Sequence, residues 1–191
     1  MVTLTPDQFT ARFADFTRSA FRLELLDHYE APNEAGPFAD FLAGQEPSHE
    51  WREPWKRFVC GKLAAGATMA RVHVVTEPLT PYVRFELTCV YPANVDAGED
   101  VRVLPRRHSE RLNLPSKDFW LLDSAMVAVM EYDDAGNWLS VDVTEDRNVV
   151  WQSAVARDAA VANSVPLDTY LAENDLNMKE NGHGRPHRRA S

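Results

Sequence analysis

The sequence has little cysteine and no long apolar run. Its two cysteines, Cys60 and Cys89, are too few for a disulfide framework, and such residues are usually small buried hydrophobes in a reducing compartment. No window approaches about 18 consecutive apolar residues, and residues 1–7 lack the basic and apolar segments of a signal peptide. We therefore expect a cytoplasmic protein with buried cysteines and no membrane span.

Basic residues are also scarce. The 20 Lys and Arg against 29 Asp and Glu give a formal net charge of -9. Because phosphate binding requires clustered Lys and Arg, the body of the protein is not expected to bind nucleic acid directly. Residues 177–191 are the exception, with four basic residues against one acid. We expect residues 175–191 to be a disordered basic tail, because they offer no pattern that could join a core.

Familiar catalytic and metal-binding motifs are missing. No Ser lies in a nucleophile elbow, and no glycine-rich phosphate loop is present. Of the six histidines, no pair in the body has a spacing suited to a shared metal. His73 alternates with valines, which favours a hydrogen-bonded residue in a strand over a catalytic base. The sequence therefore predicts no metal, no cofactor and no catalytic residue.

What the sequence does contain is the pattern of a sheet with helices. Strands are expected at residues 21–29, 69–75 and 100–105, and a meander of three strands at residues 119–122, 126–132 and 138–144. Thr5-Pro6-Asp7 predicts a helix to about Arg18, because Thr caps free N–H groups and Pro fits the first helical position. Further helices are expected at residues 38–42, 51–63 and 148–163.

Residues 82–91 carry two conflicting patterns. Apolar residues alternate with polar ones from Val83 to Cys89, as in a strand, but Thr80-Pro81 is a helix start. We favour a helix, because a strand directly after residues 76–78 would leave too little chain for a crossover.

Together these elements predict an α/β fold, with α+β as the alternative. The expected architecture is a mixed sheet with flanking helices, an N-terminal helical lobe, and a C-terminal strand meander and helix. We assign residues 1–68 to the helical lobe, packed on the core, residues 69–174 to the α/β core, and residues 175–191 to the tail.

Tryptophans divide into two expected groups. Trp55 and Trp120 lie in apolar stretches and should join the core, whereas Trp51 and Trp138 have polar neighbours and are expected to form an exposed anchor. In the helix at residues 148–163, Trp151, Val155, Ala159 and Ala162 are expected on one side.

Charged residues inside the predicted core elements give two interpretations. Buried charges must be paired, so Arg84, Glu86, Glu99 and Arg102 could form an internal network that fixes strand order. Alternatively, charged residues gather at the carboxyl ends of strands, where open α/β sheets bind ligands. That interpretation predicts a site for a ligand or a protein partner at Glu99, Arg102, Arg106 and Asp118, rimmed by Trp120.

Four blocks of the sequence resemble a known family. Val83-Arg-Phe-Glu86, Ala97-Gly-Glu-Asp-Val-Arg102, Leu114-Pro-Ser-Lys-Asp-Phe-Trp120 and Tyr132-Asp-Asp-Ala-Gly136 are similar to an uncharacterised actinobacterial family. Its members are often encoded beside helix-turn-helix regulators, and no activity is established for them. The resemblance, from about Phe16 to Tyr170, implies a regulatory setting.

Residues 97–170 also resemble, more distantly, one half of a phospholipase D-like fold. The catalytic version needs His-x-Lys-x4-Asp, in which His attacks phosphorus and Lys neutralises the phosphate. Aligned on Asp123, the chain has Ser116 in place of the His and Asp118 in place of the Lys. This resemblance implies the scaffold without the hydrolase.

These observations favour a non-enzymatic regulatory or adaptor protein. It would act through protein contact with a helix-turn-helix regulator and could sense a small ligand, because an acidic body suits a basic partner. Two alternatives stay open. One is a hydrolase or nuclease that uses Asp118 and Asp123, and the other is a component of a toxin–antitoxin pair.

Overall fold

A mixed sheet of eight strands forms the centre of the protein. The computed structural model describes residues 1–176, and its strand order is β1-β7-β6-β5-β2-β3-β4-β8. Strands β2, β3 and β4 are parallel, and the other pairs are antiparallel. The strands are β1 (Val2–Leu4), β2 (Ser19–Glu24), β3 (Thr68–Val75), β4 (Asp100–Pro105), β5 (Phe119–Leu122), β6 (Met126–Tyr132), β7 (Trp138–Thr144) and β8 (Val165–Pro166). The predicted α/β fold with a mixed sheet is confirmed.

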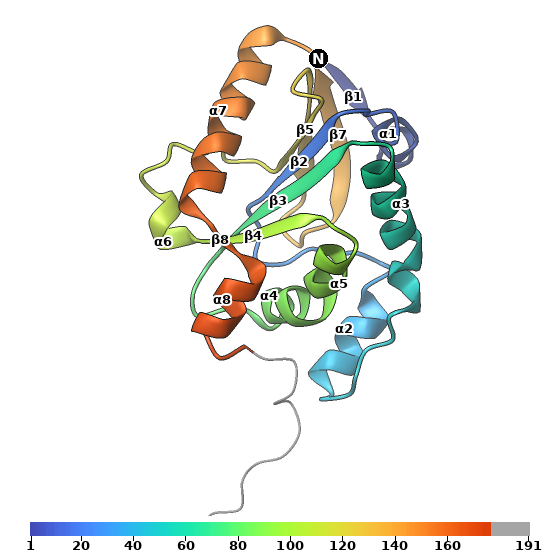
Figure 1. Cartoon of the computed structure of the whole chain (residues 1–191), viewed down its shortest axis with the longest axis vertical. Helices are drawn as coiled ribbons and strands as arrows, with labels where there is room; N and C mark the ends of the chain where they lie inside the picture. The colour runs from blue at the N-terminus through green and yellow to red at the C-terminus, as the bar shows by residue number, and fades with distance from the viewer. Residues whose placement is uncertain (177–191) are drawn as a thin grey trace, which may run out of the picture.

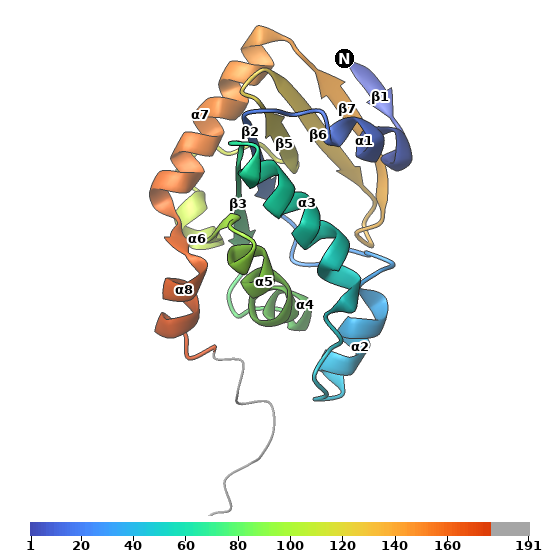
Figure 2. The ribbon, with the colours of Figure 1, turned by 45° about the vertical axis from the view of Figure 1, so that its right-hand side comes forward.

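Helices cover both faces of this sheet. They are α1 (Pro6–Phe13), α2 (Ala35–Leu42), η1 (Glu50–Arg52), α3 (Glu53–Ala64), α4 (Pro81–Phe85), η2 (Glu86–Val90), α5 (Tyr91–Asp96), α6 (Arg106–Ser109), α7 (Arg147–Asn163) and α8 (Leu167–Glu173). Helix α7 runs along one face, which we call the back face, and α3 lies on the opposite, front face (Figures 1 and 2). Among residues 1–176, no helix is long and apolar enough to cross a membrane.

Three apolar clusters hold these layers together. On the back face, alternate residues of the central strands, such as Leu23, Val72 and Leu121, pack with Ala156 and Ala160 of α7. On the front face, one cluster joins α1 and α3 to the meander strands, and another joins α4, η2 and α5 to β3 and β4. The front face therefore has two separate apolar clusters, and the central strands β2 and β3 pass between them.

The C-terminal meander forms where the sequence predicts it. Strands β5, β6 and β7 are consecutive and antiparallel, with the predicted bounds. Local alternation and the Asp133–Asn137 turn suffice for this part, because a hairpin depends on contacts between neighbouring segments. The predicted helix at residues 82–91 is also confirmed, since α4, η2 and α5 run continuously from Pro81 to Asp96. Thr80 caps α4 by accepting a hydrogen bond from the Val83 N–H.

Two N-terminal elements are shorter than expected. Helix α1 has the predicted Thr5 cap but ends at Phe13, because the Asp123 carboxylate holds the next segment by accepting hydrogen bonds from the N–H groups of Thr17, Arg18 and Ser19. Strand β2 begins there and ends at Glu24.

Residues 1–68 are more than a helical lobe. They carry α1, α2 and α3, but they also supply β1 to an edge of the sheet and β2 to its centre. Most of the expected tail, from residue 177 on, lies outside the described residues. Cys60 is exposed, contrary to the expectation of a buried thiol, because it lies on the outer side of α3.

Helix α7 has one buried side and one outer side. Small residues, Ser153, Ala156 and Ala160, face the sheet, whereas Trp151 is 67% exposed and Val155 is 48% exposed. Trp151 and Val155 do share one side of the helix, as predicted, but it is the outer side. Small side chains let the helix approach the sheet closely, so the large residues fall on the outer side.

Candidate ligand-binding site

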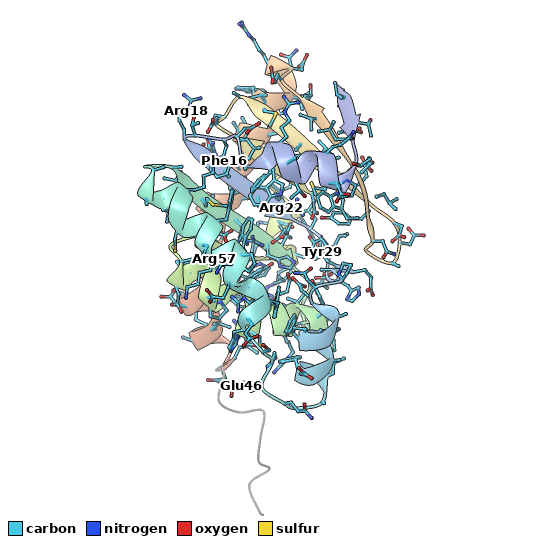
Figure 3. All side chains as sticks on the ribbon, turned by 90° about the vertical axis from the view of Figure 1, so that its right-hand side faces the viewer. Phe16, Arg18, Arg22, Tyr29, Glu46 and Arg57 are labelled. Carbon is cyan, nitrogen blue, oxygen red and sulfur yellow. The ribbon has the colours of Figure 1, made fainter. Side chains whose placement is uncertain are left out.

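Charged side chains occupy the middle of the front face. Parallel pairing places Arg22 of β2 beside Arg71 of β3, and Glu24 beside His73. Because side chains alternate along a strand, all four point to the face opposite α7. Figure 3 shows Arg22 and Tyr29 in the middle of this side of the molecule.

Two buried arginines connect the carboxylates of this cluster. Arg71 donates from Nε to Glu99 at 2.7 Å and from Nη1 to Glu24 at 3.1 Å. Arg22 donates from Nη2 to Asp118 at 3.0 Å, and its Nε lies 3.5 Å from Glu24. Burial alone would raise the pKa of Glu24, but the Arg71 and Arg22 guanidiniums outweigh it and lower the pKa to about 2. Glu24 is thus a carboxylate shared by both arginines.

Tyrosines complete the cluster. Tyr29 donates to Asp118 at 2.6 Å, and Arg22 donates to the Tyr132 hydroxyl at 2.8 Å. Burial raises the pKa of Asp118, against the opposing effect of Arg22. The cluster therefore adds side-chain polar contacts between β2, β3, the end of β6 and Asp118, the residue before β5.

Tyr91 lies where three polar groups meet. Its hydroxyl oxygen is 2.9 Å from Glu24, 3.2 Å from Glu86 and 2.9 Å from the Nδ1 of His73. A phenol has a single hydrogen and can donate to only one of these three groups, so the other two must each supply a proton. His73, fully buried, also contacts the Leu26 carbonyl at 2.8 Å through Nε2, as expected for a hydrogen-bonded histidine in the sheet.

The π-helix η2 places Glu86 in the same cluster. Burial raises the pKa of Glu86 well above its usual range, and the Glu24 and Glu34 carboxylates add to the effect. A protonated Glu86 would supply one of the protons required around Tyr91. π-helical turns are rare and occur frequently at functional sites.

A cavity of about 380 Å³ opens above the cluster. Its charged lining includes Arg22, Glu24, Arg52, Arg71 and Glu86. Seven aromatic residues also line it: Tyr29, Trp51, Trp55, Tyr82, Tyr91, Tyr132 and Trp138. A volume of this order, with apolar walls and a few polar groups, is typical of small-molecule sites.

Four of the residues that line this cavity each hold a buried polar atom without a hydrogen-bond partner. Within residues 1–176, the buried side-chain atoms without a partner are Arg22 Nη1, Trp51 Nε1, Arg52 Nε and Glu86 Oε2. All four belong to residues that line the cavity. Trp55, by contrast, donates from Nε1 to Glu99 at 3.4 Å. Because an unpaired buried polar group costs about 1–3 kcal/mol, the coincidence of four around one cavity indicates a binding site.

The structure brings together only part of the predicted site. Glu99 and Asp118 join the buried cluster, and Trp120 packs against it, with the Arg22 guanidinium 5.5 Å from its ring centroid. Arg102 and Arg106 do not join them. Arg102 binds Ser164 at 3.0 Å, and Arg106 binds Thr76 at 2.9 Å.

Strand parity explains the position of Arg102. Val101 and Val103 of β4 belong to the front-face cluster, so Arg102 and Leu104 point to the back face. The alternative internal network is likewise only partly present, since Glu86 and Glu99 are members whereas Arg84 is exposed and Arg102 lies on the other face.

Sequence reasoning missed Arg22, Glu24 and the tyrosines. Alternation from residue 21 to residue 25 predicted a half-buried strand whose polar side faces water. In the structure β2 is central and both of its faces are covered. The anchor prediction also fails, because Trp51 and Trp138 are half-buried in the cavity wall.

Asp123 and Asp118 do not form a shared catalytic pair. They flank the four residues of β5 at its two ends, so five residue-to-residue steps along the strand separate them by roughly 16 Å. Asp123 instead accepts backbone hydrogen bonds from residues 17–19. In the described part of the chain, no group of three or more His, Cys, Asp or Glu residues is placed to hold a metal ion.

Comparison with known proteins assigns the family. A family model described as a domain of unknown function, DUF6879, matches residues 7–172. The chain belongs to this family. No curated protein matches the DUF6879 chain.

Solved structures resemble this DUF6879 domain in fold. Nuc of Salmonella typhimurium, a phospholipase D family member, aligns with a TM-score of 0.51 and 8% identity, over 86% of this chain and 97% of the Nuc chain. NucT from Helicobacter pylori aligns with a TM-score of 0.48 and 9% identity, over 86% of this chain and 97% of its own. The archaeal chromatin protein TrmBL2 aligns with a TM-score of 0.46 and 12% identity, over 86% of this chain and 53% of its own. The resemblance to a phospholipase D-like fold is thereby confirmed, for the fold alone.

Proposed function

We propose that this DUF6879 domain is a non-enzymatic regulatory module that binds a small ligand and acts on a helix-turn-helix regulator. The observation that carries the proposal is the cavity above the Arg22–Glu24–Arg71 cluster, whose lining residues hold four buried polar atoms without hydrogen-bond partners. A ligand that paired with these atoms would remove their desolvation cost, which gives it a large differential affinity for this conformation.

Rigid supports surround the cavity. Arg22, Glu24 and Arg71 come from adjacent central strands, and ion pairs hold each of them in place. Binding sites are most precise when their first contacts are held by such a second layer of interactions. Segments 30–34, 51–55 and 132–138, which also line the cavity, belong to loops and element ends that a bound molecule could draw together.

Two features support a non-enzymatic role. The resemblance to phospholipase D-like proteins places Ser116 and Asp118 where catalysis needs His and Lys. Asp118 accepts hydrogen bonds from Arg22, Tyr29 and the Leu25 N–H, which leaves it little freedom to act on a substrate. Ser116 has no acidic or basic chemistry of its own.

Two features lead us to propose a helix-turn-helix regulator as the partner: the genes found beside this kind of protein, and the negative charge of the chain. The resemblance to an actinobacterial family encoded beside helix-turn-helix regulators supplies the setting. An acidic body and a formal net charge of -9 favour association with a protein whose exposed surface is basic, as DNA-binding surfaces are.

A ligand screen on the purified full chain tests this proposal. Thermal shifts with a library of small metabolites should identify at least one class that stabilises the wild type. The shift should shrink in Trp51→Phe, which loses the unpartnered Nε1 donor, and persist in Trp151→Phe, which makes the same change on the exposed side of α7.

A second measurement tests the regulatory part. The affinity of the chain for the helix-turn-helix regulator encoded beside it should change by about fivefold or more when the ligand is added. Phosphodiesterase or nuclease turnover by the wild type, with no ligand found in the screen, would overturn the proposal.

A further inference from the structure

We infer that the ligand is a zwitterion, a small molecule with one ammonium group, one carboxylate and an apolar body, as in an amino acid. This inference rests on the proposed ligand-binding function and specifies its chemistry. Two observations support it: the kinds of buried polar atom that lack a hydrogen-bond partner around the cavity, and the balance of buried charges there.

Three of the four unpartnered atoms are donors. Arg22 is 4% exposed and uses Nη2 for Asp118 and Tyr132, which leaves Nη1 free. Arg52 uses both terminal nitrogens for the carbonyls of Cys89 and Val90, which leaves Nε. Trp51 adds its indole N–H, close to Arg52, whose guanidinium lies 5.8 Å from the Trp51 ring centroid. Donors of this number and charge fit a carboxylate.

The fourth unpartnered atom is an acceptor. Glu86 is 4% exposed, and its Oε1 contacts Tyr91 while Oε2 has no hydrogen-bond partner within the described residues. Arg71, the guanidinium that acts on Glu86, is already paired with Glu24 and Glu99, and Nδ1 of His73 lies 3.4 Å from Oε2. An arriving ammonium group would give Oε2 the hydrogen-bond donor that it lacks.

The charge of the buried cluster points the same way. With Arg52 of the cavity lining included, the buried guanidiniums are Arg22, Arg52 and Arg71, whereas the buried carboxyl groups are Glu24, Glu86, Glu99 and Asp118. Carboxyl groups therefore outnumber guanidiniums, and a ligand that carried only a negative charge would add to the excess. An ammonium group on the same ligand offsets this, because a buried charge is stable only when it is paired.

Aromatic walls determine the rest of the ligand. Trp51, Trp55, Trp138 and Tyr82 line the cavity, and such rings favour a flat apolar group and also attract an ammonium ion. The volume of about 380 Å³ suits a single amino acid with an aromatic side chain.

Matched probes separate the charged groups of the ligand. The set is L-tryptophan, tryptamine, which lacks the carboxylate, and indole-3-propionate, which lacks the amine, with the corresponding phenylalanine series as a second set. Titration calorimetry on the full chain should show binding of at least one amino acid. Each of its truncated relatives should bind about tenfold more weakly or worse, because each loses one charged hydrogen bond.

Two variants test which residue binds the ammonium group of the ligand and which binds its carboxylate. Glu86→Gln should weaken tryptophan and tryptamine but leave indole-3-propionate unchanged. Trp51→Phe should weaken tryptophan and indole-3-propionate more than tryptamine, which has no carboxylate for Nε1 and meets only the ring of Trp51, and Trp151→Phe should change none of them. Thermal melts confirm that each variant folds. If Glu86→Gln does not fold, Trp51→Phe still tests the inference through the carboxylate of the ligand.

The outcomes distinguish this inference from the proposed function. If a truncated relative binds as tightly as its amino acid, or if only singly charged or uncharged molecules of a wider library bind, the zwitterion is wrong and the ligand-binding function stands. If no molecule of any class binds, both are wrong.

Discussion

Arg71 and Glu99 form the shortest ion pair of the buried cluster, with 2.7 Å between Nε and Oε1. Glu99 immediately precedes β4, and Arg71 lies inside β3, so the pair fixes the entry of β4 against its parallel neighbour. Arg71 also binds Glu24 on β2. One guanidinium thus connects all three parallel strands beneath the cavity.

Removal of this guanidinium should destabilise the fold strongly. Arg71→Ala leaves Glu24 and Glu99 buried without their cation, which typically costs about 3–5 kcal/mol. The matched control is Arg57→Ala, on the exposed side of α3, which should change the free energy of unfolding by less than about 0.5 kcal/mol. Urea unfolding measures both. Equal stability of the two variants would show that the cluster does not hold the strands together.

Gly136 should tolerate no side chain. Its φ is +89°, and a Cβ there would lie 2.8 Å from the His28 carbonyl oxygen, where the β6–β7 turn meets the rim of the cavity. We expect Gly136→Ala to destabilise by about 1–3 kcal/mol. Gly61→Ala, in the open interior of α3, should instead stabilise by about 0.5–1 kcal/mol. Thermal melts with opposite signs for the two variants would confirm the close approach, and two shifts of the same sign would contradict it.

Asp123 should prove structural. Slight burial acts to raise its pKa, but backbone hydrogen bonds from Ser19, Thr17 and Arg18 outweigh it and lower the pKa. A lowered pKa means that this contribution to stability is present above the ordinary pKa near 4 and is lost as the pH falls below it. Asp123→Asn should cost about 1 kcal/mol at pH 7, by urea unfolding, and exposed Asp134→Asn should cost nothing measurable. Loss of a phosphodiesterase activity in Asp123→Asn, at unchanged stability, would favour the hydrolase alternative.

Glu86 should make the protein less stable as the pH rises. Its pKa is raised in the folded state by burial and by Glu24 and Glu34, so its contribution is fully present below the ordinary pKa near 4.4 and is lost as the pH rises toward the raised value. The opposing groups around it are Arg71, Tyr91 and His73, with Nδ1 of His73 3.4 Å from Oε2. Between pH 5 and 8 the wild type should lose stability relative to Glu86→Gln, by up to about 1.4 kcal/mol per pH unit. Exposed Glu110→Gln should follow the wild type. Parallel profiles for wild type and Glu86→Gln would contradict the raised pKa.

Local patterns predicted the fold well, because they depend on neighbouring residues. The meander strands have the predicted bounds, and the helical residues 82–91 follow from the cap at Thr80, even though they alternate like a strand. The alternation arises because residues on more than one side of this helix are buried. Buried faces were harder to predict. In α7, small residues face the sheet and Trp151 does not, since helix–sheet distance, not hydrophobicity alone, decides which side chains fit.

The candidate site required tertiary information. Glu99 and Asp118 were found because a charge inside a core element must be paired. Arg102 was wrongly grouped with them because its position near a strand end does not say on which face of the sheet its side chain lies. The alternation of β4 does, since Val101 and Val103 lie on the front face and Arg102 between them must lie on the back face. Arg22 and Glu24 were missed because only the strand order shows that β2 is central, and that residues 51–55 and 82–91, distant in sequence, cover its polar face.

The indole N–H of Trp51 gives the most direct measurement of ligand binding in the cavity. The chain has five tryptophans, so a ¹H–¹⁵N correlation spectrum should contain five indole signals, and Trp51→Phe and Trp151→Phe assign the two that matter. On addition of the amino acid that binds best, the Trp51 signal should move as its unpartnered Nε1 gains an acceptor, while the signal of exposed Trp151 stays in place. A bound ligand that leaves the Trp51 signal unchanged, or that moves the Trp151 signal instead, would contradict a ligand site in this cavity.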